Sequence, residues 1–394
     1  MKFSKKYGIS LLILTLSLTL YSQQKKYDFS DVDYIIENAI RNQVFPSAVL
    51  VVGNDKEVIY QNAYGRLTYE DDASPTTMNT IYDLASVTKV IATTSAIMKL
   101  YDEGKLDLNQ HVTDFIPEFG VNDKGDITVM NLLLHNSGLT AWSPFYERDS
   151  SAAQVRAEIY GCSKEYPTGT KTLYSDYNAV LLGDIVGKIT GMKLNEYCKT
   201  NIFSPLGMTD TDYLLPEPLD FRIAPTENDT YWRHRLLIGE VHDETAFLLD
   251  GISGNAGLFS TGPDLNKFMQ MMLNRGLYVD PRRVPAKLRY DTLFNPGTVD
   301  YFTSKVTGLG YANTRALGWD TKPEATSHPP QCGYKFSQNS FGHTGYTGTS
   351  VWCDKEKKLI VIFLTNRVYP KRGNEEIKNI RPKVYDEVCK ILGY

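Results

Sequence analysis

The chain has 394 residues, of which 42% are hydrophobic and 22% charged, and its formal net charge is −4 at pH 7. This composition is typical of a globular protein with a substantial core, and it argues against a disordered or collagen-like chain. The slightly acidic balance gives no basic surface for DNA or RNA, so we expect no nucleic-acid partner.

The first 22 residues have the pattern of a signal peptide. Three lysines precede the 12-residue apolar run ISLLILTLSLTL, and the small Ser22 follows. The run is short for a membrane span, and no nearby cysteine could carry a lipid. We expect residues 1–22 to be removed and residues 23–394 to form one periplasmic or secreted domain with no stable membrane anchor. An uncleaved signal anchor is the alternative.

Both ends of the remaining chain predict strands and a helix. DVDYIIENAI has helical spacing, and SAVLVVGN and EVIYQNAYG are predicted strands joined by a turn at Asn54-Asp55. Near the other end, GTSVWCD and KLIVIFLTN form a second strand pair, and a C-terminal helix follows in which Pro382 introduces a kink or delays the start. These elements predict an α+β fold: an antiparallel sheet flanked by the N- and C-terminal helices, plus a helical subdomain.

Between these ends, three segments predict helices. DLASVTKVIATTSAIMKL has apolar residues at helical spacing before Gly104, ITVMNLLLHNSGL ends at Gly138, and SDYNAVLLGDIVGKITG ends near Gly191. ALGWD is expected to be a strand, but most of residues 279–340 yields no element. The five cysteines form no Cys-x-x-Cys pair, so we expect buried thiols, with at most two disulfides and no zinc site.

Ser86 and Lys89 lie three residues apart at the head of the first of these helices, so their side chains share a face. Unpaired N–H groups and the helix dipole at this end favour a developing alkoxide. A lysine among apolar neighbours loses proton affinity, so Lys89 is predicted to act as the base that activates Ser86. The alternative is an N-capping serine beside a surface lysine. The pattern alone is weak, because Ser-x-x-Lys also occurs at Ser22–Lys25.

Two later stretches extend this pattern. TLYSDYN contains Tyr174 and Asp176, and FGHTGYTGTSVW contains His343 and Thr344. Together the three motifs resemble the serine β-lactamase and penicillin-binding-protein superfamily, whose motifs are Ser-x-x-Lys, Tyr-x-Asn and Lys-Thr-Gly in that order. Tyr174 lies 88 residues after Ser86, and His343 lies 169 residues after Tyr174. These separations are similar to those of the class C β-lactamase branch, which includes D-alanyl-D-alanine carboxypeptidases and esterases. The resemblance covers about residues 30–390.

The resemblance implies a role for each matching residue. Ser86 would be the acylated nucleophile, with Lys89 as its partner. Tyr174 would shuttle the proton, its phenol acidified by Lys89. The backbone N–H groups of Ser86 and Tyr346 would form the oxyanion hole, and Thr344 would bind substrate. Tyr174 could instead be an ordinary core aromatic, and YAN at Tyr311–Asn313 is a literal second match to the middle motif.

Two positions depart from the family pattern. Asp176 replaces asparagine, so it should hold Lys89 more strongly charged and repel an anionic substrate; as an alternative it caps the helix that follows. His343 replaces lysine, so it is expected to be largely neutral at pH 7, to gain charge near pH 6, and to favour a substrate carboxylate there. A purely structural histidine is its alternative role.

Other chemistries lack their signatures. The sequence contains no Gly-x-Ser-x-Gly, His-Glu-x-x-His or P-loop motif, and EVHDE around His242 and Asp243 offers too few ligands for a metal. We therefore expect no metal or cofactor. The leading hypothesis is an exported acyl-serine hydrolase acting on an amide or ester, either a D-amino-acid peptide from cell-wall fragments or a small ester. The alternatives are a β-lactamase and a catalytically weak penicillin-binding or sensor protein on this fold.

Overall fold

The computed structural model describes residues 27–216, 220–282, 290–324 and 329–394. The predicted signal peptide, residues 1–22, lies outside the described residues. Helices occupy α1 Ser30–Arg41, α2 Ser95–Asp102, α3 Val129–Leu133, α4 Ala152–Gly161, α5 Asp176–Thr190, α6 Leu194–Cys198, α7 Ser204–Leu206, α8 Glu244–Leu248, α9 Gly262–Leu273, α10 Pro296–Thr303 and α11 Ile377–Leu392. Strands occupy β1 Ser47–Gly53, β2 Val58–Gly65, β3 Tyr82–Asp83, β4 Asn228–Asp229, β5 Arg235–Leu236, β6 Phe259–Ser260, β7 Leu277–Val279, β8 Tyr290–Thr292, β9 Asp320–Thr321, β10 Ser340–Thr344, β11 Ser350–Asp354 and β12 Leu359–Thr365.

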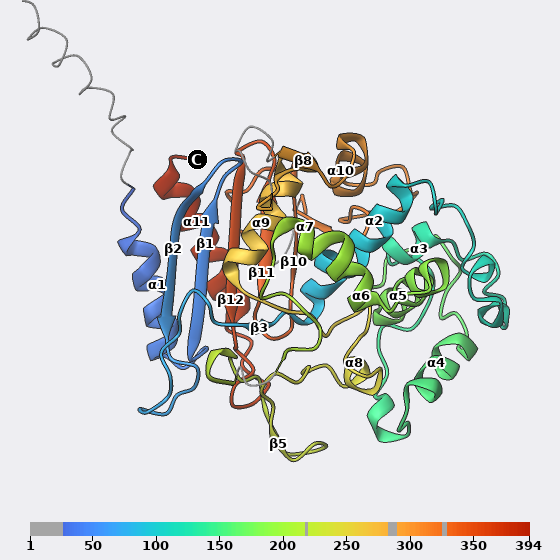
Figure 1. Ribbon diagram of the computed structural model, residues 1–394, viewed down its shortest axis with the longest axis horizontal. Coiled ribbons are helices and arrows are strands. Elements are labelled where there is room, and N and C mark those ends of the chain that lie inside the picture. Colours follow the sequence, from blue (N-terminus) through green and yellow to red (C-terminus); the bar gives the residue numbers. More distant parts are fainter. Residues whose placement is uncertain (1–26, 217–219, 283–289, 325–328) are drawn as a thin grey trace, which may run out of the picture.

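One antiparallel sheet joins the two ends of the chain, as predicted. Its six strands run in the order β2-β1-β12-β11-β10-β9, with β1 paired to β12. Figure 1 shows α1 and α11 side by side on one face, and α9 with the helical region on the other. The N-terminal and C-terminal segments therefore close one sheet, and the helical subdomain is inserted between them.

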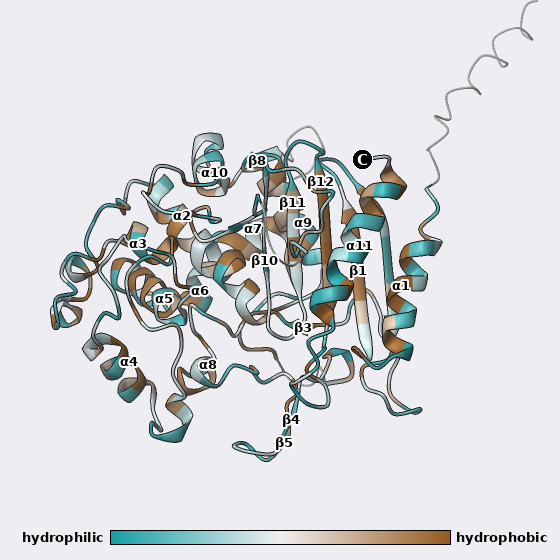
Figure 2. Cartoon of the chain, turned by 180° about the vertical axis from the view of Figure 1, so that it is seen from behind, coloured by the Kyte–Doolittle hydropathy of each residue, from teal (hydrophilic) through white to brown (hydrophobic). Residues whose placement is uncertain are grey.

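Alternate residues of the central strands face opposite sides of the sheet, and this explains why a hydrophobic core forms on each side. Leu50 and Val52 of β1 belong to the core under α1 and α11, whereas Val49 and Val51 belong to the larger core shared with α9 and the helical region. Successive strand residues face opposite sides of a sheet, so a strand buried on both faces is almost wholly apolar. Figure 2 shows brown, hydrophobic strands between helices whose outer faces are teal.

Several predicted elements differ in detail from the structure. The segment after Ser86 is helical but begins as a 3₁₀ turn, Ala85–Val87, and continues as a π-helix, Lys89–Thr94, before α2. α3 is only 5 residues long, and the predicted ALGWD strand is wrong except for Asp320, the first residue of β9. α11 continues through Pro382. The five cysteines are free, four of them buried, as expected for small apolar side chains.

A close backbone approach fixes the helical region against the segment that follows α8. A Cβ at Gly254 would lie 1.8 Å from the carbonyl oxygen of Ala179 in α5. The same loop presents two carbonyl groups toward the helical segment after Ser86: Gly254 O accepts from Thr93 Oγ1 at 2.7 Å, and Asn255 O accepts from Lys89 Nζ at 2.8 Å. The glycine thus allows a contact that supports Lys89.

We predict that Gly254→Ala lowers the free energy of unfolding by about 1–3 kcal/mol, because the added methyl group meets backbone atoms that cannot rotate away. The matched control is Gly125→Ala, whose Cβ would meet no atom within 4 Å. Urea denaturation measures both. Equal stability of the two variants would contradict the close approach of α5 and this loop.

Candidate active site

Ser86 lies in a turn whose backbone is held in an unusual conformation. Ala85 has a φ of 45°, the left-handed region that non-glycine residues seldom adopt. The buried carboxylate of Asp83 accepts a hydrogen bond from the Ala85 N–H at 2.8 Å and one from the His242 N–H at 2.7 Å. Strained backbone of this kind persists where surrounding contacts enforce it, and it is concentrated at functional sites.

Lys89 is buried beside Ser86, with 3% of its surface exposed. Its Nζ donates to Ser86 Oγ at 2.9 Å and to Asn255 O at 2.8 Å, and lies 2.7 Å from Asp176 Oδ1. Two donors of the ammonium group are used in hydrogen bonds, and Asp176 is its ion-pair partner. Burial alone would lower the pKa of Lys89, but Asp176 and Tyr174 outweigh it and raise the pKa. The predicted deprotonated lysine base is therefore wrong: Lys89 remains a cation.

Asp176 is the first residue of α5 rather than its cap, which is Ser175. Its carboxylate faces Lys89, so the helix-capping alternative is wrong, and the prediction that it holds Lys89 charged agrees with this geometry. Nearby, Asp243 caps α8 and accepts from Asn255 Nδ2 at 3.0 Å. Burial and the proximity of Asp176 raise the pKa of Asp243 to about 6.

Tyr174 lies immediately before α5, and its ring is surrounded by polar groups. The His135 ring stacks on it at 4.7 Å, Lys89 Nζ lies 5.0 Å from its centroid, and the Arg315 guanidinium lies 5.6 Å away. The phenol oxygen is buried and, within the described chain, has no hydrogen bond of good geometry. Burial raises the pKa of Tyr174, although Lys89 and Ser86 act to lower it. Lys89 thus acts on the phenol in the predicted direction, but burial outweighs it, so Tyr174 is a neutral phenol.

The turn between β10 and β11 lies against the Ser86 turn. Thr347 Oγ1 donates to Asp83 O at 2.7 Å, and Thr349 Oγ1 donates to Leu84 O at 2.9 Å. Tyr346 belongs to this turn, and its carbonyl oxygen accepts from Arg367 Nε at 2.6 Å. These bonds fix the backbone of Ser86 relative to that of Tyr346, as an oxyanion hole shared by the two N–H groups would require.

His343 is buried on β10 and, like Ser86 and Tyr174, lines the cavity described below. Its Nδ1 lies 2.9 Å from the carbonyl oxygen of Thr344, so Nδ1 carries the proton and Nε2 is left as a buried acceptor, unpartnered among the described residues. Burial lowers the pKa of His343 to about 4; Arg315 and Lys89 add to the effect and Asp320 opposes it. The expected gain of charge near pH 6 is therefore wrong, because the imidazole is neutral throughout pH 6–8.

These side chains share a cavity of about 530 Å³. Its described lining is Ser86, Tyr174, Arg315, Asp320, Gln331, His343, Thr344, Gly345, Tyr346, Arg367, Glu375, Ile377, Lys378 and Arg381. The arginines of this lining were not predicted from the sequence. Arg315 lies in the segment that could not be placed, and Arg367 and Arg381 follow the last motif, so only the folded sheet and α11 bring them to Ser86.

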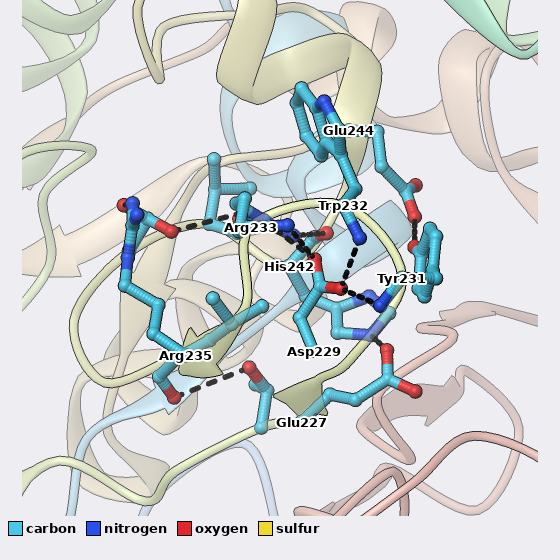
Figure 3. Close-up of polar contacts among 12 residues, drawn as sticks. Glu227, Asp229, Tyr231, Trp232, Arg233, Arg235, His242 and Glu244 are labelled. Carbon is cyan, nitrogen blue, oxygen red and sulfur yellow. Dashed lines mark hydrogen bonds and ion pairs between the residues drawn. The ribbon is translucent and has the colours of Figure 1, made fainter. Parts of the chain in front are cut away.

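EVHDE forms part of a buried polar network beside this cavity (Figure 3). His242 Nε2 lies 2.9 Å from Glu227 Oε2. Arg372 pairs with both Glu227 and Glu244. The His242 ring lies 5.7 Å from the ring of Tyr346. Because its charged groups are mutually paired, the network supports the Tyr346 turn rather than offering free ligands. Within the described ranges, no group of three or more His, Cys, Asp or Glu side chains could hold a metal ion.

YAN at Tyr311–Asn313, the second match to the Tyr-x-Asn motif, lies away from Ser86. Tyr311 Oη accepts from Asn136 Nδ2 at 2.9 Å and lies 3.4 Å from Thr172 Oγ1. It is not among the residues that line the described Ser86 cavity. Tyr174, not Tyr311, is thus the tyrosine beside Ser86 and Lys89.

Residues 32–384 match the family model described as Beta-lactamase, which covers most of the chain. The chain belongs to the β-lactamase family. The predicted superfamily, the α+β fold and the serine hydrolase class are confirmed. A protein of Bacillus subtilis (strain 168) named N-acetylmuramyl-L-alanine amidase is 35% identical over 382 residues, covering 89% of this chain and 83% of the relative.

Two further family members are similar to this chain. A protein of Escherichia coli (strain K12), provisionally named a D-alanyl-D-alanine carboxypeptidase, is 34% identical over 82% of this chain and 79% of its own length. The crystal structure of a class C β-lactamase superposes with a TM-score of 0.68 at 19% identity, covering 91% of this chain and 97% of that one. At this identity the structural match supports the fold alone.

We predict that His343 contributes to the acid sensitivity of folding. The folded state keeps it neutral down to a pKa of about 4, whereas an unfolded histidine binds a proton below about pH 6.5. The unfolded state therefore binds more protons, and stability falls as the pH drops from about 6.5 toward 4. Between pH 7.5 and 5, wild type should lose about 2 kcal/mol more than His343→Gln.

Urea titrations at the two pH values measure this difference. The control is His234→Gln, because His234 is exposed and its substitution should keep the wild-type pH dependence. If His343→Gln loses as much stability as wild type on acidification, the imidazole is not held neutral in the folded protein.

Proposed function

We propose that this family member is an exported hydrolase that cleaves an amide or ester through an acyl-enzyme on Ser86. The observation that carries the proposal is the position of Ser86 Oγ, 2.9 Å from a buried lysine and in one cavity with Tyr174. Such a serine has no packing function, and its neighbours suit a nucleophile that must lose a proton while a charge develops.

The protonation states suggest how the proton moves. Lys89 is a cation and Tyr174 a neutral phenol, so neither is a ready base at rest. As Ser86 Oγ forms a bond to the carbonyl carbon, its proton passes to Tyr174 Oη, and the phenol proton passes to the leaving nitrogen or oxygen as that bond breaks. The Lys89 ammonium stabilises negative charge on Ser86 and Tyr174 during the transfer. Water then attacks the acyl-enzyme by the reverse path.

The substrate class we propose is a D-amino-acid peptide of cell-wall origin or a small ester. The names of the two relatives support it, one being an amidase and the other provisionally a D-alanyl-D-alanine carboxypeptidase. The neutral His343 in place of a lysine disfavours an efficient β-lactamase. The alternative of a weak penicillin-binding or sensor protein predicts acylation without continued turnover. No helix among the described residues is long and apolar enough to cross a membrane. Export, to the periplasm or the medium, is proposed from residues 1–22.

We predict that Ser86→Ala abolishes both turnover of a chromogenic ester and labelling by a fluorophosphonate, and that Tyr174→Phe lowers kcat/KM by about 10²–10⁴-fold. Tyr311→Phe is the matched control and should stay within a few-fold of wild type. Peptide mapping of the label and steady-state kinetics measure these effects. Residual activity of Ser86→Ala near the wild-type level would refute the nucleophile, and a stoichiometric burst without turnover would favour the binding protein.

A further inference from the structure

The EVHDE stretch, residues 240–244, takes no part in the proposed proton transfer, yet it contacts the turn that carries Ser86. The N–H of His242 donates to Asp83 Oδ2 at 2.7 Å, and Asp83 Oδ1 accepts from the N–H of Ala85 at 2.8 Å. Asp83 is buried, so both hydrogen bonds are shielded from water. The backbone at His242 is therefore tied to the backbone immediately before Ser86.

The next residue, Asp243, is connected to Lys89 through Asn255. Asp243 Oδ1 accepts from Asn255 Nδ2 at 3.0 Å, and Ser253 Oγ donates to Asn255 Oδ1 at 2.6 Å. The backbone carbonyl oxygen of the same Asn255 accepts from Lys89 Nζ at 2.8 Å. Because both ends of its side-chain amide are held, Asn255 keeps its backbone carbonyl group directed at Lys89.

The Asp243 carboxyl group is itself fixed at the start of α8. Its Oδ1 also accepts from the N–H of Ala246 at 2.7 Å, as the N-cap of this helix. Burial and the nearby Asp176 raise the pKa of Asp243 to about 6, so the group is ionised at pH 8. A hydrogen bond to an ionised acceptor is roughly twice as strong as one between neutral groups. Asp243 therefore holds Asn255 more strongly than an uncharged side chain would.

Helix capping alone does not explain a carboxylate at this position. A cap needs only an acceptor oxygen, and uncharged side chains supply it elsewhere, Ser151 for α4 and Thr261 for α9. At the start of α8 the acceptor is instead an acid close to Asp176, and the repulsion between the two carboxyl groups helps to raise the pKa of Asp243. An arrangement that is unfavourable for stability indicates a second role for this acid.

We infer that Asp243 is a positioning residue for Lys89: it holds Asn255 so that the Asn255 carbonyl oxygen keeps the lysine ammonium group beside Ser86. The inference rests on the proposed function, because it names a residue that the reaction on Ser86 needs. Asp243 and His242 are adjacent, so one short stretch of backbone supports both the nucleophile turn and the lysine. Asp243 acts through other residues, so its loss should slow the chemical step without weakening substrate binding.

Asp243→Ala should lower kcat for a chromogenic ester at pH 8 by about tenfold or more, because small displacements of the reacting groups slow a reaction strongly. KM should stay within about twofold of wild type, since a residue that acts only on the chemical step lowers kcat and kcat/KM together. Asp243→Asn keeps an acceptor oxygen for Asn255 Nδ2 and for α8, so it should restore most of kcat. Unchanged kcat in Asp243→Ala would overturn the inference.

The matched control is Ser151→Ala, which removes the N-cap of α4 at a position that does not line the described Ser86 cavity. It should lower the melting temperature and leave kcat as in wild type. If Ser151→Ala lowers kcat as much as Asp243→Ala does, the loss follows from helix capping in general, and the positioning role is refuted.

A double-mutant cycle tests the route through Asn255. Asn255→Ala keeps the backbone carbonyl group but removes the amide that Asp243 holds. Asn255→Ala, Asp243→Ala and the double variant should all lower kcat by about the same factor, because the three remove one and the same contact. Single losses that multiply in the double variant would show two independent effects and would overturn the proposed route.

Nitrogen-15 NMR of the Lys89 ammonium group tests the inference without turnover. Hydrogen exchange of this group should be faster in Asn255→Ala than in wild type and unchanged in Ser151→Ala. Equal exchange in Asn255→Ala and wild type overturns the inference, even if Asp243→Ala does not fold. Failure of the proposed function would differ from this result: wild type would show no turnover that depends on Ser86, whatever the exchange rate at Lys89.

Discussion

The buried ammonium group of Lys89 is the contact on which the site depends. It donates hydrogen bonds to Ser86 after β3 and to the carbonyl oxygen of Asn255 in the loop after α8, and it forms an ion pair with Asp176 at the start of α5. These three segments are far apart in the chain. Because the ammonium group contacts all of them, it holds them at fixed distances from one another in space. The cost of burying the charge is offset only while all three partners are in place. The same contacts decide the chemistry, because they keep the lysine protonated.

Of the two motif side chains that could carry a positive charge in the cavity, Lys89 is a cation and His343 is neutral. Positive charge beside the nucleophile comes from the Ser-x-x-Lys motif, whereas the third motif supplies an uncharged imidazole. The other cations of the described lining, Arg315, Arg367, Lys378 and Arg381, lie outside the motifs.

The helices, strands and site residues that depend on a local sequence pattern could be predicted from the sequence. Helical spacing located α1 and α5, alternation and apolar runs located β1, β2, β11 and β12, and the spaced motifs located Ser86, Lys89 and Tyr174. Protonation states could not be predicted, because they depend on contacts between distant segments: Asp176 reverses the expected pKa shift of Lys89, and burial reverses that of Tyr174. Arg381 was missed for the same reason, since nothing around Pro382 indicates that α11 borders the cavity.

A double-mutant cycle on Lys89 and Asp176 tests the central claim most directly. The free energy of unfolding at pH 7 is measured for wild type, Lys89→Met, Asp176→Asn and the double variant. Each single substitution leaves a charge without its partner, at a cost of about 3–5 kcal/mol, whereas the double substitution removes both charges. We predict that the double variant is at least about 2 kcal/mol more stable than the sum of the single effects implies. Additive effects would show that Lys89 is not held as a cation by Asp176, and would contradict this account.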